Sequence, residues 1–284
     1  MMRCRPARSR YGQVDPSHDV ASGAMPRQDG VVTTNETVGR GGIGEGPVGW
    51  KELGDRLTAA LHLAVAPVGI SFHGSVPDRV PAFDAPMSEP ADDGRQGRVA
   101  AGCVFWIHGA ERPFSTVPED HGNCSVGRVT HGLAELGEVA GNADVATLLG
   151  SGWVDDADMM SVPRVSLRSA AVVYGPIGSS DVDPDVVLLR VNGRQMMVLH
   201  DAVPGMAIEG KPQCHIVALA KEHGKVAASV GCALSRARTG MRPEEMTCAI
   251  PAARLAEVVE ALERTSEIDS MVATYAARDG RRSA

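Results

Sequence analysis

The chain has 284 residues and a formal net charge of −7; 43% of its residues are hydrophobic but only 4% are aromatic. This balance suits one large globular domain or two modest ones, with a core of aliphatic side chains and alanine. It is not the balance of a general nucleic-acid binder, which needs clustered Lys and Arg, and no apolar run approaches the roughly 18 residues that cross a bilayer.

The N-terminal residues 1–46 are rich in Arg, Ser, Gly, Pro and Asp and lack any helical or strand periodicity, so we expect a disordered tail. Met25 is an alternative start within it. A G-x-G-x-x-G match at 39–44 has no strand before it and is interpreted as linker. The folded domain is expected over 47–268 and a flexible C-terminal tail over 269–284. No apolar segment follows the first arginines, so we expect no secretory signal and a cytoplasmic protein.

In the first half of the folded part, apolar residues recur at helical spacing over 50–63 and predict an amphipathic helix. A short strand is expected at 68–72, followed by a Pro-rich surface loop at 74–97. The short apolar run at 101–107 is interpreted as a strand. The remaining elements expected in this half are helices at 126–136 and 145–149 and a strand at 170–174.

The second half alternates in the same way. The continuous apolar run at 186–191 has the pattern of a strand that is buried on both faces. Asn192 is placed to cap a helix over 194–202, and Pro251 favours the first turn of a helix over 252–264. The other expected elements are a helix at 214–221 and strands at 226–230 and 247–250. Because there is no regular β–α–β rhythm, we expect an α+β or mixed α/β fold, as a single compact domain with a mixed sheet.

Four cysteines occur as two similarly spaced pairs, one in each half of the chain. Cys103 and Cys124 form the first pair and Cys214 and Cys232 the second, and the second member of each pair has a glycine nearby. Two related halves with a site between them would explain this spacing. Coincidence in a Gly-rich chain explains it equally well.

Several short blocks, in a fixed order, resemble the DUF169 family of soluble proteins. They are GCVFW at 102–106, PEDHGNCSVG at 118–127, PDVVLL at 184–189, KPQC at 211–214 and SVGCALSR at 229–236. The resemblance runs from about residue 50 to residue 264 and leaves the N-terminal tail outside. It implies a family fold and four matching cysteines, but no substrate.

The candidate metal ligands are therefore Cys103, Cys124, Cys214 and Cys232. Thiols in the cytoplasm stay reduced unless they bind metal or do chemistry, and four thiolates suit zinc or an iron–sulfur cluster. The closely spaced cysteine pairs of structural zinc sites are absent, which favours a cluster, expected as 4Fe–4S, with a role in redox chemistry or electron transfer. The alternative is a non-redox small-ligand-binding module in which the thiols pack as small apolar groups. Cys4 and Cys248 are left outside the site.

Three further residues are functional candidates. His121 lies three residues before Cys124 and could act as a general acid or base, or activate that thiol in a Cys/His enzyme; the alternative is an exposed loop histidine. Arg194 and Arg236 are candidates for binding an anionic ligand, with a surface salt bridge as the alternative for each. The expected partners are a redox partner or a small-molecule ligand, with no nucleic acid and no membrane. The sequence leaves the reaction and the oligomeric state open.

Overall fold

The computed structural model describes residues 49–84, 102–122, 124–209, 212–239 and 241–279. All of them belong to one compact unit, Glu45–Ala284. The expected tail at 1–46 and its G-x-G-x-x-G match lie outside the described residues, as does much of the predicted loop at 74–97.

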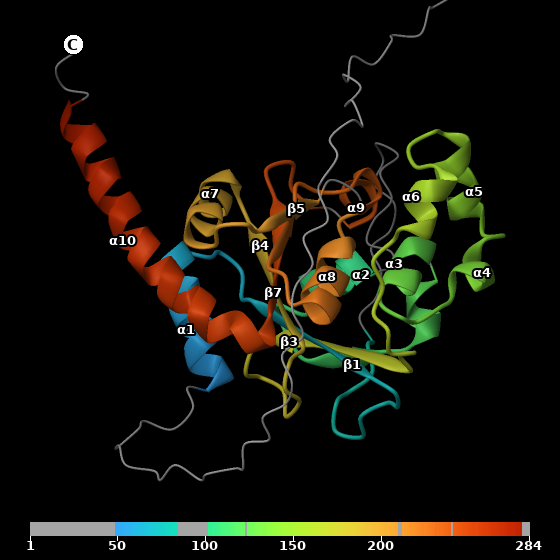
Figure 1. Ribbon diagram of the computed structural model, residues 1–284. Helices are drawn as coiled ribbons and strands as arrows, with labels where there is room; N and C mark the ends of the chain where they lie inside the picture. The colour runs from blue at the N-terminus through green and yellow to red at the C-terminus, as the bar shows by residue number, and fades with distance from the viewer. Residues whose placement is uncertain (1–48, 85–101, 123, 210–211, 240, 280–284) are drawn as a thin grey trace, which may run out of the picture. The chain divides into compact units, whose positions relative to one another are not determined.

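Seven strands of the described part form one mixed sheet in the order β2-β3-β1-β4-β7-β6-β5 (Figure 1). Neighbouring strands are antiparallel except for the parallel pair β5 and β6. The central strand β4 is buried along almost its whole length, as its continuous apolar run predicts. The strands are β1 (Val68–His73), β2 (Phe114–Thr116), β3 (Ala171–Pro176), β4 (Val186–Val191), β5 (Ala207–Glu209), β6 (Ala227–Ser229) and β7 (Met246–Pro251).

Successive side chains of a strand point to opposite faces, so the sheet carries an apolar cluster on each side. Val186 and Leu188 of β4 belong to one cluster, and Val187 and Leu189 belong to the other. The second face is covered by α1 (Trp50–Leu61), α7 (Gly193–Ala202) and α10 (Leu255–Asp279). The first face is covered by α2 (Gly102–His108), α3 (Ser125–Thr130), α5 (Ala143–Gly150), α6 (Asp156–Met160) and α8 (His215–His223).

The shorter helices complete the described part. They are the 3₁₀ helices η1 (Pro118–His121) and η2 (Ala252–Arg254), with α4 (Leu136–Val139) and α9 (Ala233–Thr239). Among the helices that the structure describes, none is both long and apolar enough to cross a membrane.

The mixed α+β fold predicted from the sequence is confirmed, as are most of the predicted elements. Asn192 caps α7 as expected, since its side chain accepts a hydrogen bond from the Gln195 N–H at 3.0 Å. The strand predicted at 101–107 is wrong, because α2 occupies 102–108. This helix is buried almost all round, and a short run that is apolar on every side has no periodicity to separate a helix from a strand.

The helix predicted at 126–136 ends early, at Thr130. Gly132 follows with φ of +68°, and a Cβ at this position would lie 2.3 Å from the backbone oxygen of Leu167. Only glycine fits such a turn without strain, so the chain leaves the helix here.

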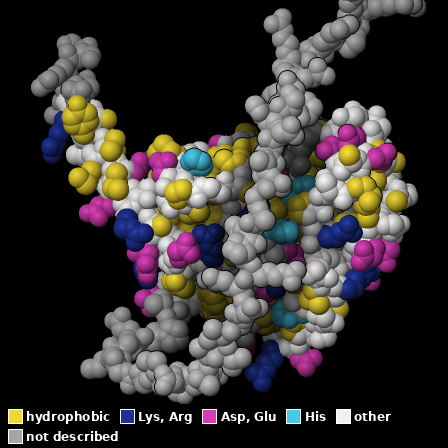
Figure 2. Space-filling model, viewed as in Figure 1, with side chains coloured by type: hydrophobic (Ala, Val, Ile, Leu, Met, Phe, Trp, Pro, Cys, Tyr) yellow, Lys and Arg dark blue, Asp and Glu magenta, His cyan; other side chains and the backbone are white. Residues whose placement is uncertain are grey.

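The C-terminal helix α10 continues through Asp279, whereas a flexible tail was expected from residue 269. Its first turns are held in the core by buried apolar side chains, and Arg56 donates two hydrogen bonds of 2.8 Å to Glu263. Beyond that point its apolar side chains are exposed, as Figure 2 shows along the end of the helix. The exposed apolar side chains are Ile268, Met271, Val272 and Tyr275.

Candidate four-cysteine site

Four separate segments of the chain bring the predicted cysteines to one cavity. Cys103 lies in the first turn of α2, and Cys124, Cys214 and Cys232 each directly precede a helix, namely α3, α8 and α9. All four line the same cavity, on the face of the sheet that α2, α3 and α8 cover. Two segments come from the first half of the chain and two from the second.

The rest of this cavity, which we call the cysteine cavity, has no charged lining among the described residues. It has room for water-sized molecules of only about 30 Å³, and the larger volume of about 440 Å³ includes space that is open to solvent. Cys214 and Cys232 are 4% and 7% exposed, whereas Cys103 and Cys124 are half-buried. The remaining lining residues are Val126, Leu148, Trp153, Pro212, Gln213, Leu234 and Ser235.

The four thiols surround a space and do not converge on a point. Among the described His, Cys, Asp and Glu side chains, no three are arranged to hold one metal ion. A zinc ion needs its four ligands together at about 2.0–2.3 Å from the metal. The arrangement is therefore not preformed for a single ion.

The thiols of Cys103 and Cys214 are protonated at neutral pH. Burial raises the pKa of the Cys103 thiol to about 12, and the nearby Cys124 and Cys232 add to the rise. Burial also raises the pKa of Cys214 well above its usual value, again with contributions from the other thiols. These mutual effects are those of sulfurs that lie close together, and each thiol must lose its proton before it can bind a metal.

Polar groups reach the sulfurs from the surrounding elements. The Gly127 N–H donates to Cys124 Sγ at 3.4 Å. Thr130 Oγ1 lies 3.6 Å from Cys214 Sγ, and because its hydroxyl donates to the Val126 carbonyl at 2.8 Å, the Cys214 thiol is the donor to Thr130.

Gln213 and Ser235 form a buried polar pair beside Cys103. Gln213 Nε2 donates to Ser235 Oγ at 2.8 Å, and hydrogen bonds from both side chains partly offset the raised pKa of Cys103. Gln213 Oε1 is buried and has no hydrogen-bond partner among the described residues. Sequence reasoning missed these two side chains and Thr130; the available signal was that Gln213 and Ser235 lie within the same sequence blocks as Cys214 and Cys232.

His121 lies behind the site and does not line the cavity. Its ring is 0% exposed and its Nε2 is 2.9 Å from Thr116 Oγ1, so the alternative of an exposed loop histidine is wrong. Burial, with smaller contributions from His131 and Arg128, holds the pKa of His121 well below its usual value. The ring is therefore neutral at pH 7, and a catalytic role for it stays a prediction.

The two candidate arginines have partners within the protein. Arg194 of α7 is ion-paired with Asp269 of α10. Arg236 donates to the backbone oxygens of Arg242, Val230 and Glu245 at 2.5–2.8 Å. Neither arginine lines the cysteine cavity, so anion binding by either one stays a prediction.

Cys248 lies apart from the site, as the sequence blocks imply. It belongs to β7 and is fully buried in the cluster on the α1, α7 and α10 face, with its Sγ 3.9 Å from Met206 Sδ. Cys4 lies outside the described residues.

The fold and the site together define a mixed α+β protein with four cysteines around one cavity. The family DUF169, described as an uncharacterised ArCR, matches residues 56–261, and the chain belongs to this family. Comparison with curated proteins and with solved structures found no match. All four cysteines fall inside the matched residues.

Proposed function

We propose that the cysteine cavity binds an iron–sulfur cluster through Cys103, Cys124, Cys214 and Cys232, and that the cluster exchanges single electrons with a redox partner. The observation that carries this proposal is that four dispersed cysteines line one cavity that has no other ionisable side chain among its described lining residues. Thiolate is the protein ligand that iron–sulfur clusters use most.

The arrangement of the sulfurs favours a cluster over a single ion. A 4Fe–4S cluster takes one thiolate at each of four separated iron atoms, so its ligands surround the cluster. Four thiols that line one cavity, with no three arranged for one ion, fit that requirement better than they fit zinc, and the cavity would widen to admit the cluster.

The surroundings of the thiols also suit a cluster. The Gly127 N–H already donates to Cys124, and Gln213 and Ser235 lie against Cys103, where their N–H and O–H groups can donate to a thiolate. Hydrogen bonds of this kind, together with burial, set the reduction potential of a cluster. The half-buried Cys103 and Cys124 would provide the side nearest to a partner.

A second candidate function is a small-ligand site with protonated thiols. It is favoured by the raised pKa values of Cys103 and Cys214, because neutral thiols behave as small apolar groups. In this case the cavity would hold an organic molecule and no iron.

Anaerobic reconstitution of the full chain with iron and sulfide separates the two functions. We expect about four iron atoms per chain and a brown protein with a broad visible absorption band. Cys214→Ser should lose most of the iron. Cys248→Ser is the matched control, since it changes an equally buried thiol on the other face of the sheet.

Two results would contradict the cluster proposal. One is wild-type protein that stays colourless and iron-free after reconstitution while remaining folded. The other is equal iron content in the folded Cys214→Ser and Cys248→Ser proteins.

A further inference from the structure

A second and larger cavity adjoins the cysteine cavity. The two share Val126, Leu148, Trp153 and Pro212 as a common wall. The second cavity has a volume of about 350 Å³, which lies within the size range of small-molecule sites. We call it the His215 cavity, after the residue that follows Cys214 and lines it.

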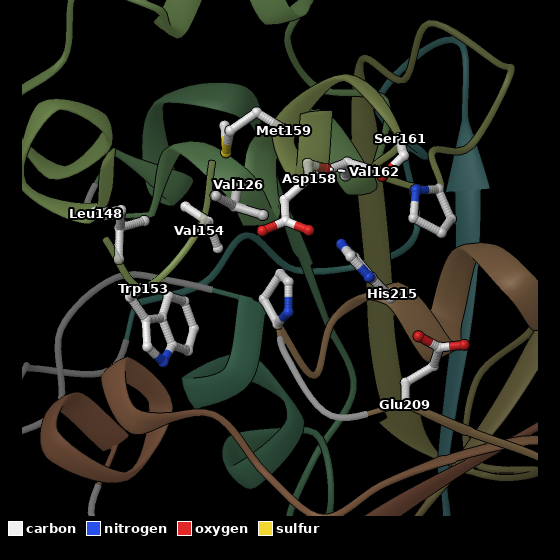
Figure 3. A pocket seen from close by; sticks show the side chains of 12 residues that line it. Val126, Leu148, Trp153, Val154, Asp158, Met159, Ser161, Val162, Glu209 and His215 are labelled. Atoms are coloured by element: carbon white, nitrogen blue, oxygen red, sulfur yellow. Dashed lines mark hydrogen bonds between the residues drawn. The ribbon is translucent and has the colours of Figure 1, made fainter. Parts of the chain in front are cut away.

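His215 offers this cavity an unsatisfied polar atom. The residue is 8% exposed, and its Nε2 is buried without a hydrogen-bond partner among the described residues. Figure 3 shows the polar atoms of His215 and Asp158 turned toward each other, with Glu209 beside His215. A buried nitrogen without a partner is unfavourable, and a bound donor would relieve it.

The charge of the cavity is negative. Asp158 at α6 and Glu209 at the end of β5 contribute carboxylates, and no Lys or Arg is among the described lining residues. A neutral imidazole has one nitrogen that accepts a hydrogen bond. All three polar groups can therefore accept hydrogen bonds from one cationic donor.

The three groups do not form a metal site, since no three of the described His, Cys, Asp and Glu side chains are arranged to hold an ion. The opposite side of the cavity is apolar and carries Leu148, Trp153 and Val154, as Figure 3 shows. The cavity thus has an acidic, hydrogen-bond-accepting side and a hydrocarbon side, and an occupant must match both.

We propose that the His215 cavity binds a small organic cation, a protonated primary amine on an apolar body. Its N–H groups reach Asp158 and Glu209 and donate to His215 Nε2, while its apolar part lies against Leu148 and Trp153. This site goes beyond the cluster proposal and does not depend on it. The shared wall places the bound ligand next to the cysteine cavity. A molecule that reacts with a group held in the cysteine cavity would have to lie there.

The test uses three probes of similar shape on the full chain in its iron-free form: 2-phenylethylamine, 2-phenylethanol and 3-phenylpropionate. Isothermal titration calorimetry at pH 7 should give an affinity for the amine at least about tenfold above that for the alcohol, with no measurable binding of the acid. The proposal is overturned by an amine that binds no better than the alcohol.

Matched variants assign the effect to this cavity. Asp158→Asn should weaken amine binding about tenfold, since it removes one charged acceptor but keeps an oxygen for its own hydrogen bond with the Asp155 N–H. Asp156→Asn makes the same charge change two residues away on α6, outside the lining, and should leave binding unchanged. Glu209→Gln provides the same test from another element if Asp158→Asn does not fold. Equal losses in the lining variants and in the control would disprove the site.

Iron content plays no part in these measurements, so this proposal and the cluster proposal can each fail alone.

Discussion

Neighbouring residues of β7 show how one position decides the surroundings of a thiol. Cys248 faces the cluster on the α1, α7 and α10 side, whereas Ala249 faces the side that holds the cysteine cavity. Because side chains alternate along a strand, the fifth described cysteine cannot join the other four without a shift of register. Cys248 is therefore an internal reference for every experiment on the four.

We predict that the thiols of Cys103 and Cys214 resist alkylation in the iron-free protein. Because the pKa values of Cys103 and Cys214 are raised, almost none of either thiol is thiolate at pH 7.5, and the thiolate is the reactive form. Peptide mass spectrometry after iodoacetamide treatment should find both unmodified in the folded protein and fully modified in denaturant. Labelling in the folded protein as fast as in denaturant would contradict the raised pKa values. Cys248, whose pKa burial raises to about 12, is the control that should behave in the same way.

The four cysteines could be picked out from the sequence, but their neighbours could not. The blocks GCVFW, KPQC and SVGCALSR contain three of the four thiols and indicate them as a set. That Gln213 and Ser235 approach Cys103, or that His215 opens into a second cavity, depends on how α2, α8 and α9 pack together. His121 lies in a matched block as well, yet its ring is turned into the core.

At the level of elements, α10 changes from a core helix to an exposed one along its length. Leu255, Val258, Val259 and Leu262 are fully buried or nearly so, and the apolar face predicted for them is confirmed. From Ile268 onward the large apolar side chains are exposed, although the helix continues. Periodicity predicted the first part because burial creates a pattern; the second part has no such constraint.

We predict that two similar truncations in α10 have very different effects on stability. Leu262→Ala should lower the free energy of unfolding by about 2–5 kcal/mol, because Leu262 is 0% exposed. Ile268→Ala, at a residue that is 61% exposed, should change it by less than about 0.5 kcal/mol. Urea denaturation followed by circular dichroism measures both. Similar losses would mean that the end of the helix is packed in solution.

The contrast between local sequence signals and tertiary contacts explains which elements could be predicted from the sequence. β4 and α7 carry their own signals, a doubly buried apolar run and an Asn cap. α2 carries none, since it is short and apolar all round, and the sheet and α9 decide its conformation. The turn at Gly132 is required by the backbone oxygen of Leu167, a residue 35 positions further along the chain, which no local pattern reveals.

For the whole molecule, buried neutral histidines make stability depend on pH. Burial lowers the pKa of His131 and of His215 to about 4, and that of His121 well below its usual 6.5. The unfolded chain binds protons at these sites below about pH 6.5, whereas the folded chain binds them at His131 and His215 only near pH 4 and at His121 only well below its usual pKa. Their contribution to stability is therefore complete above pH 6.5 and is lost as the pH falls toward 4.

We accordingly predict that the melting temperature falls steadily between pH 6.5 and pH 4.5. Differential scanning fluorimetry of the iron-free protein measures it, and NMR of the ring protons should show His131 neutral down to about pH 5. A melting temperature that is unchanged over this range would contradict the burial of these rings in a neutral form.

Loading of the cysteine cavity should also stabilise the whole domain. A ligand that binds only the folded state raises its stability by mass action, by about 2.7 kcal/mol at one hundred times its dissociation constant. We predict a higher melting temperature for the reconstituted wild type than for the iron-free protein, measured without oxygen, and no such rise for Cys214→Ser. A rise of equal size in that variant would place the iron elsewhere.

The distribution of the four thiols along the chain also bears on how the protein is made. Cys103 and Cys124 leave the ribosome well before β3, β4 and α7 exist, and Cys214 and Cys232 come only afterwards. A partial set of two thiols is therefore exposed during synthesis with no complete site to occupy. If the proposed cluster binds to these thiols, its insertion is a late step, open only to chains that have already joined their early and late segments.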